Sequence, residues 1–117
     1  MSAPPKKPGI IQGTLDLLIL RTLVFGPIHG HGMVKHIKST SDDVLSVEHG
    51  SLYHALQRLE KVGCITSSWE QTGSGRELKL YRITPKGRKQ LKAEESKWEQ
   101  LSQAMARLLR PATGRPS

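Results

Sequence analysis

Residues 48–92 decide the fold of this chain, and they read EHGSLYHALQRLEKVGCITSSWEQTGSGRELKLYRITPKGRKQLK. Apolar residues recur at helical spacing in the first part of this stretch, which predicts a helix over residues 48–62. The apolar residues of that helix are Leu52, Ala55, Leu56 and Leu59. Gly63 follows and can adopt the left-handed conformation that ends a helix, so the helix should stop there.

A β-hairpin is expected directly after this helix. Side chains alternate in character along residues 64–72, and a return strand is predicted over residues 76–84, where Tyr81 and Ile83 share one face. The segment between them, Gly73-Ser74-Gly75, contains the residues that best tolerate a positive φ. The helix is therefore followed by two antiparallel strands with a small, glycine-rich tip.

The last helix has a clear start and an apolar stripe. Thr84 is a good N-cap and Pro85 suits the first helical position, so we expect a helix over residues 85–110. Its stripe has heptad-like spacing, interrupted by Glu94, and consists of Leu91, Trp98, Leu101, Met105 and Leu108. Such a long helix extends beyond a small core, so we expect the same helix of a second copy to cover the stripe. The alternative is packing on the first helix of the same chain, and we expect the first and last helices to share an interface.

The part of the chain before residue 48 predicts two more helices. The first covers residues 15–25, with Thr14 as N-cap and Asp16 in the first turn, and the second covers residues 30–39. A brief extended segment is expected at residues 44–47. We therefore divide the chain into a disordered basic arm (1–9), a domain of three helices and a hairpin (10–84), a dimerisation helix (85–110) and a flexible tail (111–117).

Positive charge is concentrated in one part of the chain. The formal net charge is +8, and residues 51–92 hold nine Lys and Arg against three Glu. This favours a polyanionic partner, with nucleic acid first and an anionic membrane second, although a basic face kept for solubility remains the alternative. The single cysteine, Cys64, excludes an intrachain disulfide, and no apolar run could span a bilayer. These features favour a cytoplasmic protein.

Three helices followed by a hairpin is the order of a winged helix-turn-helix fold, in an α+β chain that is mostly helical. Residues 10–84 would then be a DNA-binding domain, and its third helix would enter the major groove of double-stranded DNA. The candidate DNA-binding residues are Ser51, Tyr53, His54, Gln57, Arg58, Lys61, Ser74, Arg76 and Lys79. Charged members of this set suit phosphates, and polar members suit base edges or phosphates. The Tyr53 hydroxyl could instead brace the hairpin or the neighbouring helix.

Several blocks of sequence, taken in order, resemble the PadR family of bacterial transcription regulators. The blocks are GTLDLLIL (13–20), GPIHG (26–30), GSLY (50–53), LQRLE (56–60), YRIT (81–84) and Gly87. The resemblance covers residues 13–108 and implies a winged-helix domain, a homodimer formed by the C-terminal helix, and repression released by a small molecule. His54 stands where the family commonly has Pro, and His31 where an aromatic residue, often Tyr, is usual.

The resemblance also implies a ligand site. In drug-sensing members of the family, a tryptophan of the dimerisation helix stacks on planar ligands, and Trp98 lies at a similar place. A site for a small planar or phenolic effector would then include Trp98, Leu101 and Leu15. The alternative is that Trp98 is an ordinary interface aromatic. We expect no metal and no cofactor, since the five histidines show no ligand spacing, and His29 more often caps or braces the second helix.

Three functions compete at this point. The first is a sequence-specific dimeric repressor that binds an inverted-repeat operator. The second is a winged-helix adaptor that binds only proteins, which the basic residues 51–92 argue against. The third is a nonspecific nucleic-acid binder. No motif of an enzyme is present, because the glycine-rich turn lacks phosphate-loop spacing and no nucleophile motif occurs.

Overall fold

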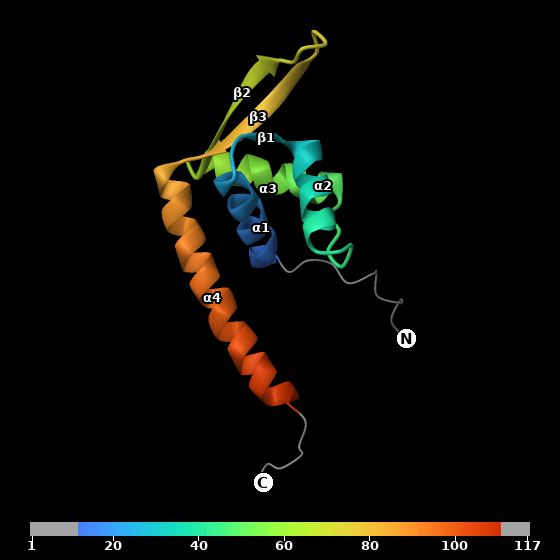
Figure 1. The fold of residues 1–117 in the computed structure, drawn as a ribbon. Helices are drawn as coiled ribbons and strands as arrows, with labels where there is room; N and C mark the ends of the chain where they lie inside the picture. Colours follow the sequence, from blue (N-terminus) through green and yellow to red (C-terminus); the bar gives the residue numbers. More distant parts are fainter. Residues whose placement is uncertain (1–11, 111–117) are drawn as a thin grey trace, which may run out of the picture.

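The computed structural model describes residues 12–110 and contains four α-helices and three β-strands in that part of the chain. The order is α1 (Gln12–Val24), β1 (Ile28–His29), α2 (Gly30–Thr40), α3 (His49–Lys61), β2 (Ile65–Gln71), β3 (Glu77–Ile83) and α4 (Pro85–Leu109). Helices α1, α2 and α3 form a cluster, the hairpin projects from one end of it, and α4 descends along its side (Figure 1). This is the predicted winged-helix architecture.

The sheet is antiparallel and its strand order is β1-β3-β2. The hairpin register runs from Ile65 opposite Ile83 to Gln71 opposite Glu77, and Gly75 in the turn has a φ of +85°. Strand β1, which adds a third strand to the hairpin, was not predicted. It is only two residues long, and it pairs with β3 so that Ile28 lies opposite Tyr81. The prediction of an extended segment at residues 44–47 was wrong, since these residues lie in a loop.

Side chains from α1, α2, α3 and β2 form most of the core, and β3 and α4 each add one buried side chain, Tyr81 and Leu91. The most deeply buried large residues are Ile19, Leu20, Leu23, Met33, Leu52, Leu56 and Ile65. Thr22 is also buried, and its hydroxyl donates to the carbonyl of Leu18 one turn earlier, which satisfies its polar atom inside the core. The apolar faces predicted for the first three helices therefore point inward.

The start of α1 differs from the prediction. The helix begins at Gln12, so Thr14 lies inside the first turn and is not the N-cap, and no acidic residue lies in that turn. Asp16 is therefore not placed to interact with the helix dipole. It lies instead among groups from α3 and α4, where it has a different role that is described below.

Helix α4 starts as predicted. The Thr84 hydroxyl accepts a hydrogen bond from the Gly87 amide at 3.0 Å, and Pro85 occupies the first turn. The first half of α4 packs against α1, where Leu91 is buried and Arg21 forms a 3.9 Å salt bridge with Glu95. The predicted interface between the first and last helices is thus confirmed, and the second half of α4 extends past the body of the domain (Figure 1).

Two predicted segments, the basic arm at residues 1–9 and the tail at residues 111–117, lie outside the described residues. Within residues 12–110, no helix has the length and apolar character needed to cross a membrane.

Candidate nucleic-acid interface

Helix α3 is divided into a buried face and an exposed polar face. Leu52, Ala55, Leu56 and Leu59 are all at most 4% exposed, which fixes the orientation of the helix against the core. Five of the candidate DNA-binding residues lie on the exposed face: Ser51, Tyr53, His54, Gln57 and Lys61. The helix therefore presents a continuous polar surface to solvent, as expected for a helix that enters a groove.

Arg58 departs from this pattern. Its guanidinium donates to the Asp16 carboxylate of α1 in a partly buried ion pair. Partial burial raises the pKa of the Asp16 carboxyl, Arg58 opposes that shift, and Glu94 of α4 adds to it. Arg58 is directed toward α1 and neutralises Asp16 there, which conflicts with its predicted contact with a phosphate.

The tip of the hairpin is small and exposed. Residues 73–76 are all exposed, and the Thr72 amide donates to the Arg76 carbonyl at 2.7 Å to close the turn. The Thr72 and Ser74 hydroxyls lie 3.0 Å apart. Arg76 and Ser74 thus stand at the outer end of the hairpin, where a groove or phosphate can approach them without contact with the body of the domain (Figure 1).

Side-chain contacts stiffen the hairpin and fix it to α3. Arg82 of β3 donates to the Glu70 carboxylate at 2.7 Å and to the Ser68 hydroxyl at 2.8 Å, both on β2. The hydrogen bonds that Glu70 accepts from Arg82 and Ser68 lower the pKa of its carboxyl. At the base of the hairpin, the Ser67 hydroxyl donates to the Glu60 carboxylate of α3 at 2.6 Å. This hydrogen bond fixes the base of the hairpin to α3.

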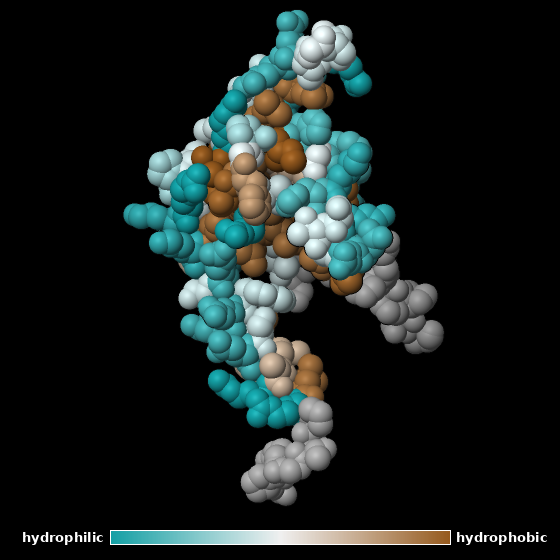
Figure 2. Space-filling model, viewed as in Figure 1, coloured by the Kyte–Doolittle hydropathy of each residue, from teal (hydrophilic) through white to brown (hydrophobic). Residues whose placement is uncertain are grey.

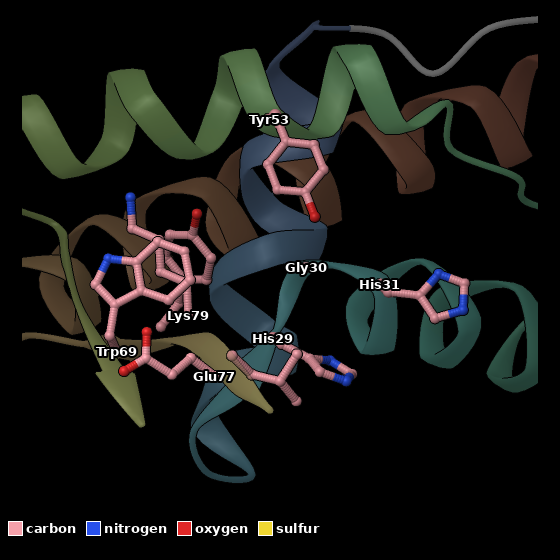
Figure 3. Close-up of a pocket in the computed structure, with 9 residues that line it drawn as sticks. His29, Gly30, His31, Tyr53, Trp69, Glu77 and Lys79 are labelled. Carbon is pink, nitrogen blue, oxygen red and sulfur yellow. The ribbon is translucent and has the colours of Figure 1, made fainter. Parts of the chain in front are cut away.

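A cavity of about 270 Å³ lies between α3, the start of α2 and the hairpin. Figure 3 shows Tyr53 on α3 across from Trp69 and Glu77 on the hairpin, with His29 beside Glu77 and Gly30 near the Tyr53 hydroxyl. The Lys79 ammonium lies 6.0 Å from the centre of the Trp69 ring and 5.8 Å from that of Tyr81. Lys79, a predicted phosphate contact, is thus held over two aromatic rings at the edge of this cavity.

Two tyrosines have structural roles at the cavity. Tyr81 is buried, and burial, with smaller contributions from Tyr53 and Glu60, raises the pKa of its hydroxyl. Tyr53 lies against α2 so closely that its hydroxyl oxygen would be 2.6 Å from a Cβ atom on Gly30. The Tyr53 ring therefore packs against α2, in agreement with the alternative prediction that Tyr53 braces the neighbouring helix. The residue is still 43% exposed, so a partner can also contact it.

Three histidines make side-chain contacts at the starts of α2 and α3. His29 caps α2, because its Nδ1 accepts the Gly32 amide at 2.9 Å, as predicted. His31 and His49 contact one another, with Nδ1 of His31 3.2 Å from Nε2 of His49. Among residues 12–110, no three His, Cys, Asp or Glu side chains gather in a way that could hold a metal ion.

The stripe of α4 is split into a buried and an exposed part. Leu91 is 5% exposed and belongs to the domain's own core, as does Leu15 of α1 at 7%. Trp98, Leu101 and Met105 are each 45–47% exposed, and Leu108 is 80% exposed. Figure 2 shows apolar side chains on the far part of α4, away from the body of the domain. The prediction that Leu91 lies in a dimer interface conflicts with this burial, since little of its surface remains to be covered.

A family model, described as the transcriptional regulator PadR-like family, matches residues 19–93, which include α2, α3 and the whole hairpin. This chain belongs to the PadR-like family. The match begins inside α1 and ends inside α4, so it contains the polar face of α3 and the tip of the hairpin.

Solved structures agree with this assignment. A transcriptional regulator from Clostridium thermocellum is 30% identical, with a TM-score of 0.78 over 85% of this chain and 93% of that one. A PadR-like transcriptional regulator from Bacillus cereus is 26% identical, with a TM-score of 0.73 over 86% of this chain and 95% of that one. The chain is also similar to PadR of Bacillus subtilis in complex with operator DNA, at 28% identity and a TM-score of 0.62, over 68% of this chain and 45% of that one.

Sequence reasoning missed four features of this surface. They are the Trp69 and Lys79 contact, the Glu60 link to the hairpin, the Asp16 partner of Arg58, and the His31–His49 contact. The unusual histidine at position 31 was noticed in the sequence, but its partner is 18 residues away and had no local signal.

Proposed function

We propose that this PadR-like protein is a sequence-specific regulator that binds operator DNA as a homodimer and acts as a repressor. The observation that carries the proposal is the exposed polar face of α3 beside the basic tip of the hairpin. The similar Bacillus subtilis protein, solved in complex with operator DNA, supports the use of this fold on duplex DNA. No feature of the described surface favours a protein adaptor over this function.

In the proposed complex, α3 lies in the major groove, where Ser51, His54 and Gln57 can form hydrogen bonds with base edges. Lys61 near the end of α3, and Arg76 and Ser74 at the hairpin tip, contact phosphates on either side. Lys79 and Tyr53, at the edges of the cavity between α3 and the hairpin, face the sugar-phosphate backbone that crosses between the two elements. Arg58 contributes indirectly, since its ion pair with Asp16 fixes α3 against α1.

The far half of α4 is the proposed dimer interface. Trp98, Leu101, Met105 and Leu108 form one apolar stripe at heptad-like spacing, and this chain's own body leaves them exposed. An isologous pair of α4 helices would cover both stripes and would place two α3 helices symmetrically, which is what an inverted-repeat operator requires. Leu91 is excluded from the interface because it is already buried within its own chain.

A small planar or phenolic effector is the proposed inducer. Trp98 and Leu101 of both protomers would lie at the centre of the dimer, where two tryptophan rings could stack on a flat molecule. Leu15, the third predicted ligand residue, is covered by its own chain and is left out of the site. Binding that changes how the two α4 helices cross would change the spacing of the two α3 helices.

The test begins with duplexes selected from fragmented genomic DNA by the purified protein. Their affinity is compared with that of scrambled versions by gel shift and fluorescence anisotropy at low and moderate salt. We expect an inverted repeat among the selected sequences and a preference for it of at least about a thousandfold. Equal affinity for scrambled DNA would favour the nonspecific binder, and no binding at low salt would refute the DNA function.

A further inference from the structure

Two histidines that the proposed surface does not use meet where α2 and α3 begin. His31 is the second residue of α2 and His49 is the first residue of α3, and both side chains are exposed. Their facing nitrogens are 3.2 Å apart, their ring planes differ by 14°, and the ring centres are 5.5 Å apart. The ring centres are as far apart as that nitrogen separation permits, so the rings meet edge to edge nearly in one plane.

This geometry requires one proton between the two facing nitrogens. One imidazole donates through N–H and the other accepts with its lone pair, so in the neutral pair only one of the two outer nitrogens carries a proton. A proton added to the other outer nitrogen leaves the inner hydrogen bond in place and gives the pair one positive charge. Both outer nitrogens are then donors. A second added proton would turn both inner nitrogens into donors and break the hydrogen bond between them. The pair therefore favours the uptake of one added proton over two.

Each element next to the pair also carries charged or titratable residues. They are Lys35 one turn along α2, His29 of β1, Glu48 just before α3, Tyr53 one turn along α3, and Glu77 and Lys79 of β3, which line the same cavity as His31. His29 is occupied by its hydrogen bond from Gly32, and its ring centre is 6.4 Å from that of His31. Across residues 12–110, neither imidazole of the pair has a salt bridge to a carboxylate, so no ion pair among these residues neutralises a proton gained there.

We propose that the His31–His49 pair is a proton-linked contact to a backbone phosphate of duplex DNA. The inference rests on the DNA-binding function proposed above and adds two residues to its surface. A phosphate oxygen accepts from an outer nitrogen of the singly protonated pair, beside the positive N-terminal ends of α2 and α3. Binding to DNA therefore takes up one proton, and affinity increases as the pH falls across the range in which histidine titrates, about pH 8 to 5.

The test measures binding of a fluorescein-labelled mixed-sequence duplex by anisotropy, over a series of pH values and salt concentrations. For the wild type, we expect affinity to increase by up to about tenfold per pH unit in the titration range, the limit for uptake of one proton. The slope of log affinity against log salt should be steeper by about one unit at the acid end, because one more phosphate is neutralised.

The double variant His31→Gln/His49→Gln should lose this pH-dependent increment and have the same salt slope at both ends. His36→Gln is the matched control, because His36 is on the same helix but faces Phe25 and Thr40. It should retain the increment. Since His54 also lies on the α3 surface, the comparison is repeated in a His54→Gln background, which separates any titration of His54 from that of the pair.

A nitrogen-15 NMR titration of the wild-type imidazoles tests the shared proton without any substitution. The ring nitrogens of His31 and His49 should shift together at one midpoint for the first proton, and two independent midpoints would overturn the inference. An unchanged increment in a folded double variant would also overturn it, while DNA binding itself would stand. Failure to bind the duplex at any pH at low salt would instead refute the DNA function.

Discussion

Gly87 lies where the first turn of α4 packs tightly against the base of the hairpin, and replacing it with alanine should destabilise the protein. A Cβ atom at this position would lie 2.1 Å from the Cys64 carbonyl oxygen and 2.8 Å from Cγ1 of Ile83. The Cys64 oxygen cannot move freely, because it also accepts hydrogen bonds from the Thr84 amide and the Thr84 hydroxyl, each at 3.0 Å. The first turn of α4 would therefore have to move away from the hairpin.

Two effects of opposite sign decide the magnitude of the Gly87→Ala change. Alanine favours a helix over glycine by about 1 kcal/mol. Overpacking at a well-packed position costs about 1–3 kcal/mol, and a clash with the backbone belongs at the upper end of that range. We expect the free energy of unfolding to fall by about 2 kcal/mol, which lowers Tm by about 8 °C for a chain of this size.

The assay is thermal and urea unfolding followed by circular dichroism, with every variant at the same protein concentration because dimerisation would contribute to stability. Gly50→Ala is the matched control, since Gly50 is in α3 and a Cβ atom added there would have no atom within 4 Å beyond its own helix. That variant should keep or gain stability, by up to about 1 kcal/mol. A Gly87→Ala protein as stable as the wild type would refute the packing argument.

Three further variants test the other parts of the molecule. Arg76→Ala should weaken binding to all duplexes and reduce the salt slope by about one unit; Lys38→Ala, at the far end of α2, is the control, and an unchanged slope would remove Arg76 from the phosphate contacts. Trp98→Ala should shift sedimentation toward the monomer while the helical content stays the same. The Trp69→Phe variant, in which Trp98 is the remaining tryptophan, should keep a change of tryptophan emission with planar dyes or phenols, and Trp98→Ala, which keeps Trp69, should lose it. A stable Trp98→Ala dimer with a normal dye response would contradict both roles. The raised pKa of Asp16 means that the folded state binds the proton of this carboxyl more tightly than the unfolded state does. The stability that the proton contributes is therefore lost as the pH rises from the ordinary pKa of 3.8 through the raised pKa of the folded state. Asp16→Asn should therefore gain stability relative to the wild type over that pH range in urea unfolding, and the opposite trend would show that Arg58 outweighs burial.

The elements that the sequence predicted well have local signals. The start of α4 follows from Thr84 and Pro85, and the end of α3 from Gly63, whose φ is +86°. The burial of Leu52 and Leu56 follows from helical periodicity, which each helix carries by itself. Such features need no knowledge of the rest of the chain, and they were sufficient to determine the order of the four helices and the hairpin.

The features that were missed depend on partners far away in the sequence. Strand β1 is two residues long, so its existence depends on Leu80 and Tyr81 about fifty positions later. The sequence does not distinguish Arg58 from the other basic residues of α3, because its partner, Asp16, lies 42 residues earlier. Similarly, neither Leu15 nor Leu91 could be assigned from spacing to the chain's own core or to a partner, because both environments favour the same apolar residue types.

The Cys64 carbonyl joins the two halves of the proposed function. It accepts from Thr84, which begins α4, and it lies against Gly87, while the next residue, Ile65, begins β2 of the hairpin. The hairpin is in turn tied to α3 through Ser67 and Glu60. In the proposed dimer, a change in the crossing of the α4 helices would therefore reach the DNA-binding elements through a rigid junction rather than a flexible linker. The length of α4 would then convert a small rotation where the two exposed stripes cross into a larger displacement of the two α3 helices, and so change the operator spacing that the dimer fits.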